Sequence, residues 1–200
     1  MQIARFTGTL AIAALFAAGV AVPAVAQDHD AHAAMTASGP RTAAQNELVE
    51  TVRRATARFR NVTDPAGPGE GYELMFGCVS GGDFGAMGLH YVNGPLVFDG
   101  QIDAAAPEII LFEPTSNGRI RITGADYIVL ADAWNATHAG PPELNGQLFH
   151  YFEAPNRFGL PAFYTLHVWA WKDNPMGTFT NWNPRVSCDG FNPPTASAAR

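Results

Sequence analysis

The chain has 200 residues, of which 47% are hydrophobic and 15% are charged, and its formal net charge is −6. This length is enough for one domain with a substantial core. Basic residues are sparse and form no long run, whereas nucleic-acid-binding proteins cluster Lys and Arg to neutralise phosphates. We therefore expect no nucleic-acid partner.

The first 26 residues have the pattern of a secretory signal peptide. Arg5 supplies a positive start, residues 10–22 are apolar, and Ala24-Val25-Ala26 is a small-x-small cleavage site. The apolar run is short for a membrane span, and no charged stop-transfer segment follows it. We predict cleavage after Ala26, a periplasmic or secreted mature protein, and no membrane span once the signal is removed.

The mature chain is predicted to start with a flexible leader at 27–40, which shows no periodicity. The next segment, 42–60, has apolar residues at helical spacing and is predicted to be an amphipathic helix. Its apolar positions include Leu48, Val52, Ala55 and Phe59. The globular domain is expected to run over 41–192, with a disordered tail at 193–200.

From Tyr72 onward, short apolar segments alternate with turns rich in Gly, Pro, Asn and Asp, which is typical of β-structure. Short links between strands imply an antiparallel meander. The predicted fold class is α+β, with one N-terminal amphipathic helix packed on a curved antiparallel sheet of about six strands. Whether this sheet closes into a barrel stays open. The predicted strands are 72–78, 86–93, 107–113, 118–131, 147–153 and 161–172.

The last predicted strand, 161–172, is the densest part of the chain. Its side chains alternate between two faces, and both faces are largely apolar. One face holds Tyr164, Leu166, Val168 and Ala170. We therefore expect a central strand that is covered on both sides, followed by an aromatic loop that folds back over a strand end. The opposite face holds Phe163, Thr165, His167, Trp169 and Trp171.

Cys78 and Cys188 are the only cysteines of the chain. In an exported protein two cysteines are expected to pair. The bridge would close a loop of more than a hundred residues, and loop-closure entropy would then stabilise the fold by about 4–5 kcal/mol. We predict a disulfide between the first strand and the end of the aromatic loop.

Two strings of the sequence carry a resemblance to a protein family. They are Gly88-Leu89-His90-Tyr91-Val92-Asn93 and Leu166-His167-Val168-Trp169-Ala170-Trp171-Lys172-Asp173-Asn174-Pro175. Over residues 45–190 the chain resembles an uncharacterised family of exported bacterial proteins with G-x-H-Y-V-N and L-H-V-W-x-W-x-x-N-P motifs. The resemblance implies a bacterial exported protein and brings no assigned activity.

Three histidines, His90, His150 and His167, fall inside predicted strands, and Asp126 lies mid-strand as well. Polar groups inside an apolar sheet must be satisfied. If they gather at one site, two or three imidazoles and a carboxylate would suit a transition metal, with Cu, Zn and Fe as candidate cofactors. The competing interpretation is that each residue forms its own hydrogen bonds in the core or at an edge, because the spacing shows no metal-binding motif.

Three hypotheses of function follow. The first is binding of a small ligand or a metal ion in a cavity near His90 and His167. The second is an enzyme at the same place, with one of these histidines as general base and Asp126 or Glu108 as its partner. The third is a structural envelope protein without a site. The oligomeric state stays open. The aromatic residues expected to line the cavity, or else to pack in the core, are Trp169, Trp171, Trp182, Phe179 and Tyr91.

Overall fold

The computed structural model describes residues 40–192. The predicted signal peptide, the predicted leader up to residue 39 and the predicted tail lie outside the described residues. None of the helices within this range is long and apolar enough to cross a membrane. The helices are α1 (Ala43–Thr56), η2 (Ala57–Phe59), η3 (Gly82–Phe84), α2 (Gly94–Phe98) and α3 (Ala131–Asn135).

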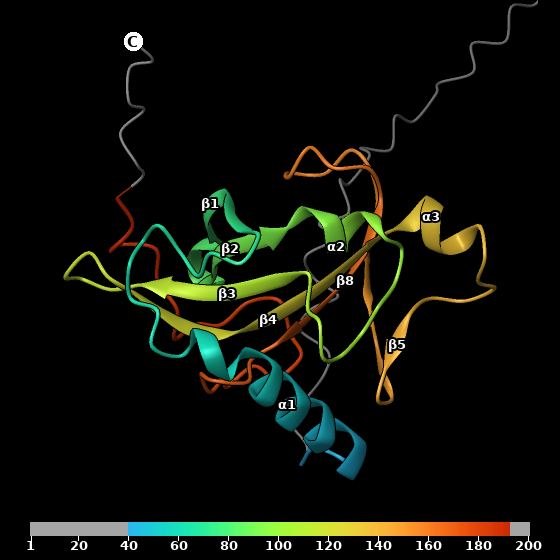
Figure 1. Cartoon of the computed structure of the whole chain (residues 1–200), viewed down its shortest axis with the longest axis horizontal. Coiled ribbons are helices and arrows are strands. Elements are labelled where there is room, and N and C mark those ends of the chain that lie inside the picture. The colour runs from blue at the N-terminus through green and yellow to red at the C-terminus, as the bar shows by residue number, and fades with distance from the viewer. Residues whose placement is uncertain (1–39, 193–200) are drawn as a thin grey trace, which may run out of the picture. The chain divides into compact units, whose positions relative to one another are not determined.

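The fold is α+β, as predicted, and is built on one antiparallel sheet with the strand order β1-β2-β3-β4-β8-β7 (Figure 1). Over the described residues the sheet is open, with β1 and β7 at its edges, while β5 and β6 form a separate hairpin. The strands are β1 (Tyr72–Ser80), β2 (Ala86–Asn93), β3 (Ile109–Pro114), β4 (Ile120–Leu130), β5 (Glu143–Leu144), β6 (Gln147–Leu148), β7 (His150–Phe152) and β8 (Phe163–Val168).

Helix α1 forms where the apolar periodicity predicts it and begins with a capping box. The hydroxyl of Thr42 accepts a hydrogen bond from the backbone N–H of Gln45 (3.2 Å), and the side chain of Gln45 accepts one from the N–H of Thr42 (2.9 Å). Figure 1 shows α1 against one face of the sheet, beside β4. Leu48, Val49 and Val52 of α1 are buried there in one cluster with residues of β4 and β8, so the helix covers one face and leaves the opposite face for other groups.

A β-bulge in β4 brings the end of β8 close to it. Leu111 of β3 pairs with Gly124, while the next residue of β3 pairs with Ile122, so Thr123 is the extra residue. A glycine inside a strand often marks such a bulge. A Cβ atom on Gly124 would lie 2.1 Å from the carbonyl oxygen of Val168, so the close approach of the two strands requires glycine here.

A second bulge interrupts β1. Met75 pairs with His90 and Cys78 pairs with Leu89, so Phe76 and Gly77 are both left over. Each of these two residues has a φ of 64°, which is an unusual conformation for a phenylalanine. The bulge turns the Phe76 side chain toward the face of the sheet that α1 does not cover.

Two of the predicted strands differ most from the structure. β8 ends at Val168 rather than at residue 172, because the backbone N–H groups of Trp169 and Ala170 donate to the carbonyls of Thr178 and Val168 and not to β4. The segment 147–153 is split because its two parts pair with different strands: Gln147–Leu148 pairs with β5, whereas His150–Phe152 pairs with β8.

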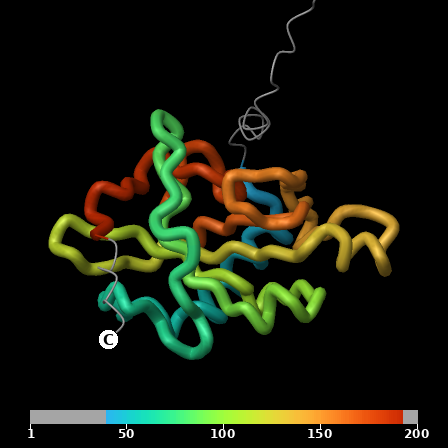
Figure 2. The backbone as a smooth tube through the Cα atoms, turned by 90° about the horizontal axis from the view of Figure 1, so that it is seen from above, coloured from blue at the N-terminus to red at the C-terminus, as the bar shows by residue number. Residues whose placement is uncertain are grey.

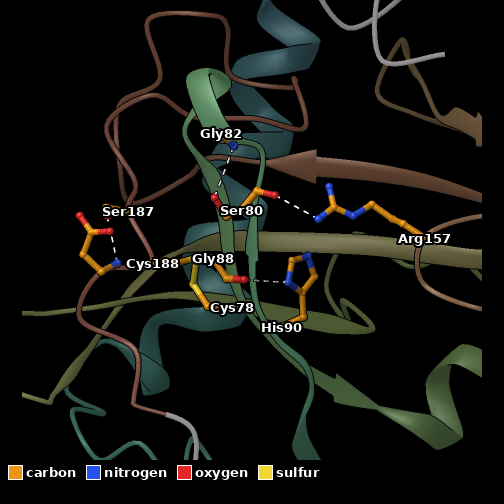
Figure 3. The surroundings of a disulfide bond; sticks show 9 residues. Cys78, Ser80, Gly82, Gly88, His90, Arg157, Ser187 and Cys188 are labelled. Carbon is orange, nitrogen blue, oxygen red and sulfur yellow. Dashed lines mark hydrogen bonds between the residues drawn. A yellow bond between two sulfur atoms is a disulfide. The ribbon is translucent and has the colours of Figure 1, made fainter. Parts of the chain in front are cut away.

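The aromatic loop after β8 folds back over the sheet, as expected. Asn183 exchanges backbone hydrogen bonds with Ala86 at the start of β2 (3.2 Å each). Cys188 then forms the predicted disulfide with Cys78 of β1. Figure 3 shows this bond beside Gly88, close to His90, so the covalent link joins the end of the loop to the strands that carry the first candidate histidine.

Candidate metal centre

The structure brings three of the predicted site residues together on the face of the sheet opposite α1. They are His90 of β2, Asp126 of β4 and His167 of β8, and all three are buried. One potential ligand atom from each lies within 4.8 Å of the other two. Among the described residues this is the group of His, Cys, Asp and Glu side chains that could hold a metal ion.

Strand register and the twist of the sheet together bring these three residues close to one another. Asp126 and His167 are direct partners in the β4–β8 ladder, so their side chains share a face. His90 comes from β2, with β3 between it and β4, yet its ring centroid is only 5.7 Å from that of His167. Figure 2 shows β1 and β2 running across the direction of β4. This strong twist carries His90 over the two strands that carry Asp126 and His167.

His90 is oriented in the way that metal-binding histidines usually are. Its Nδ1 lies 3.1 Å from the carbonyl oxygen of Gly88 (Figure 3). A carbonyl can only accept, so Nδ1 must carry the proton, and the lone pair of the neutral ring is then on Nε2. Ligand histidines commonly donate their second nitrogen to a backbone carbonyl in this manner.

His167 has no hydrogen-bond partner among the described residues, although both of its ring nitrogens are buried. Its Nδ1 lies 3.2 Å from Oδ1 of Asp126, but the two groups do not have the geometry of a hydrogen bond. Leaving a buried imidazole unsatisfied costs free energy. A ligand that accepts the lone pair of His167, as a metal ion does, would relieve this cost.

Thr165 is a functional residue that the sequence analysis did not single out. Its hydroxyl donates a 2.6 Å hydrogen bond to Oδ1 of Asp126 from two residues before His167 on the same face. This contact fixes the carboxylate. The alternation of Thr165 with His167 in the last predicted strand was the signal that could have found it.

Burial sets the protonation states of the three residues. Burial lowers the pKa of His90 to about 4, against the opposing effect of its hydrogen bond to Gly88. Burial, followed by the proximity of His90, lowers the pKa of His167 well below its usual value. Burial also raises the pKa of Asp126 to about 7, with the Thr165 hydrogen bond opposing the rise. At neutral pH both imidazoles are therefore uncharged and have a lone pair available for a metal.

A small apolar pocket of about 30 Å³ lies directly against the cluster. His90, His167 and Thr165 line it through carbon atoms only, so its surface is apolar, and Asp126 does not line it. Its remaining walls come from β1, β2, β3, β4, β7, β8 and the loop between β7 and β8. They are Phe76, Met87, Ile109, Ile128, Phe152, Phe158, Leu160 and Phe163.

The other predicted site residues lie elsewhere. Nε2 of His150 lies 3.3 Å from the carbonyl of Phe179, outside the cluster. Glu108 is buried and its carboxylate accepts a hydrogen bond from the N–H of Ile128. None of the five aromatic residues expected around a cavity lines the pocket at the cluster.

Those five aromatic residues have packing roles instead. The indole N–H of Trp169 donates to the carbonyl of Thr180 (2.6 Å), and that of Trp171 donates to the hydroxyl of Thr56 in α1 (2.9 Å). Phe179 and Trp182 are buried in two different core clusters. Tyr91 lines a separate pocket of about 350 Å³.

The chain was compared with known proteins at three levels. No protein-family model, no curated protein and no solved structure matches it.

Proposed function

We propose that this is an exported bacterial protein that binds a transition metal ion with His90, Asp126 and His167. The observation that carries the proposal is the imidazole of His167, which is buried without a hydrogen-bond partner beside a second neutral imidazole and a carboxylate. Two imidazoles and one carboxylate form a ligand set used for Fe(II) and Zn(II).

The surroundings of the three residues support the same assignment. Two of the three proposed ligands have a hydrogen-bond partner outside the cluster: His90 donates to the Gly88 carbonyl, and Asp126 accepts from the Thr165 hydroxyl. Such outer contacts hold ligand atoms in place before the ion arrives. The disulfide fits the oxidising compartment that an exported protein enters.

A metal centre is favoured over metal-free acid–base catalysis by the same groups. A general base needs a basic nitrogen held by its carboxylate. Here burial lowers the pKa of His167 and raises that of Asp126, and the two groups do not form a hydrogen bond. A divalent cation favours the ionised carboxylate and the neutral imidazoles together, so it fits this set of donors better.

The test is metal analysis of the mature protein, beginning at Gln27, purified from periplasm without an affinity tag. Asp126→Asn keeps an oxygen that can accept from Thr165, and His167→Gln keeps a polar side chain of similar size. His150→Gln is the matched control, because it removes a half-buried histidine outside the cluster.

We expect about one metal ion per chain in the wild type and in His150→Gln. We expect less than about one tenth of that content in Asp126→Asn and His167→Gln, with the disulfide and the circular dichroism spectrum unchanged. Equal metal in all four proteins, or no metal in the wild type after reconstitution with Fe(II), Zn(II), Co(II) and Cu(II), would overturn the proposal.

A further inference from the structure

We infer that the metal ion keeps one coordination position open toward the apolar pocket, and that this position takes a neutral diatomic molecule such as O₂ or NO. The inference rests on the proposed function and adds the class of ligand that the centre receives. It is carried by the position, size and lining of the pocket relative to the three protein ligands.

The protein ligands approach the centre from the sheet. His90, Asp126 and His167 all project from strands on one face. The two histidines line the pocket, whereas Asp126 does not. An ion held by all three would lie beside this pocket, and the pocket is the space toward which its open coordination position would face. Three protein ligands with open positions suit an Fe(II) ion that binds a small exogenous molecule.

The size of the pocket restricts what can occupy these positions. Its volume of about 30 Å³ exceeds the roughly 10–15 Å³ that one water molecule needs in a cavity, so it has room for a molecule of one or two heavy atoms. A diatomic molecule fits with small movements of the walls, whereas a sugar, a peptide or an aromatic ring does not.

The lining of the pocket favours a neutral ligand. Its exposed walls are apolar throughout, and the hydroxyl hydrogen of Thr165 is already donated to Asp126. A charged or strongly hydrated ligand would lose its hydration without a hydrogen bond in return. A small apolar molecule has no such cost, and apolar pockets of this kind bind apolar ligands in preference to water.

Two phenylalanine rings form the outer part of the pocket. Phe76, which is 41% exposed, and Phe158 meet edge to face with ring centroids 5.7 Å apart. Phe76 is placed by the β1 bulge, and Phe158 belongs to a loop that Arg157 joins to the carbonyl of Ser80 (3.1 Å, Figure 3). Phe76 therefore borders the pocket on the side that faces solvent.

The experiment uses nitric oxide on the Fe(II)-loaded mature protein under anaerobic conditions, with the ferrous nitrosyl detected by electron paramagnetic resonance. Leu160→Phe places a larger side chain in the pocket and leaves the three candidate ligand residues unchanged. Leu148→Phe makes the same change at an exposed position outside the pocket and serves as the matched control. Iron content is measured in every sample.

We expect a nitrosyl signal in the wild type and in Leu148→Phe, and binding of nitric oxide about tenfold or more weaker in Leu160→Phe at equal iron content. If Leu160→Phe loses iron, the measurement is repeated with Phe158→Trp, which narrows the same pocket. Bound iron without a nitrosyl in the wild type would overturn this inference and leave the metal site standing. Equal nitrosyl formation in the wild type and in the variant with the filled pocket would also overturn this inference and leave the metal site standing. A wild type that takes up no iron would contradict the centre itself and this inference with it.

Discussion

Thr165 determines where the carboxylate of Asp126 points. Its hydroxyl lies 2.6 Å from Oδ1 of Asp126, and both residues are buried. In this cluster one histidine already has a backbone partner and the other has none. The carboxylate is therefore the group of the cluster whose orientation depends most on a single neighbouring side chain.

Replacing Thr165 with valine should weaken metal binding without unfolding the protein. Valine has the same shape but cannot hold the carboxylate, and loss of such an outer partner typically costs 10–100-fold in metal affinity. Competition with a chromophoric chelator would measure this affinity. Thr165→Ser keeps the hydroxyl and should retain most of the metal affinity. If the role of Thr165 were purely steric, the valine variant would instead bind metal more tightly than the serine variant.

Glu108 should make the metal-free protein less stable as the pH rises. Burial raises the pKa of Glu108 to about 8, and the nearby Asp126 adds to the rise. The unfolded chain releases this proton near its ordinary pKa of about 4.3. Between these two values the folded state binds more protons than the unfolded state. The free energy of unfolding therefore falls as the pH rises through this window, by up to about 1.4 kcal/mol for each unit of pKa shift.

Urea unfolding of the metal-free protein between pH 5 and pH 9 would test this effect. Asp126 acts in the same direction, because its pKa is also raised, so both groups contribute to the decline. Glu108→Gln removes one contribution and should give a shallower decline. Parallel curves for the two proteins would show that Glu108 does not titrate as described.

At the scale of secondary structure, the bulge in β4 sets the distance between β4 and β8. Gly124 allows the carbonyl of Val168 to come close, and the carbonyl of Thr123 accepts hydrogen bonds from Trp171 and Lys172. This geometry keeps the chain against β4 beyond the end of β8 at Val168, one residue after His167. The same contact thus positions the strand that carries His167 and the start of the loop that covers the sheet.

Replacing Gly124 with alanine should destabilise the protein by about 1–3 kcal/mol, because the new methyl group meets backbone that cannot move freely. It should also weaken metal binding by displacing His167. Gly94→Ala is the matched control, since a Cβ atom there meets nothing within 4 Å. Thermal unfolding and metal titration would measure both effects, and equal behaviour of the two variants would contradict this account of the bulge.

The sequence predicted the elements well because their signals are local. The helical spacing around Leu48 and Val52 and the glycine inside the long strand are each visible in a short window. The C-terminal end of β8 was not predictable in this way, because it depends on which partners the N–H groups of Trp169 and Ala170 take, and Trp169 donates to Thr178 in the loop.

At the scale of the whole molecule, the candidate centre depends on how far the sheet twists. His90 and His167 lie on strands separated by β3 and β4, and no sequence spacing shows that their rings meet. The sequence named the three residues as candidates because polar groups in apolar strands need partners. It could not separate them from His150, nor indicate that the walls of the pocket come from Phe76 and Phe158 rather than from the tryptophans.

The disulfide holds β1 and the end of the aromatic loop together across a sequence separation of 110 residues. Replacing both Cys78 and Cys188 with alanine should lower the free energy of unfolding by about 4–5 kcal/mol, since the unfolded chain regains its loop entropy. Urea unfolding of the oxidised, reduced and double-alanine proteins would measure this. The reduced and double-alanine proteins should agree, and an unchanged stability in both would contradict the entropic account.

The most direct test of the metal centre is a crystal structure of the metal-reconstituted mature protein with anomalous diffraction recorded at the absorption edge of the metal. We predict one anomalous peak between the imidazoles of His90 and His167 and the carboxylate of Asp126, on the pocket side of the sheet. No peak at this position in crystals that contain the metal, or a peak bound by other residues, would contradict the proposed function.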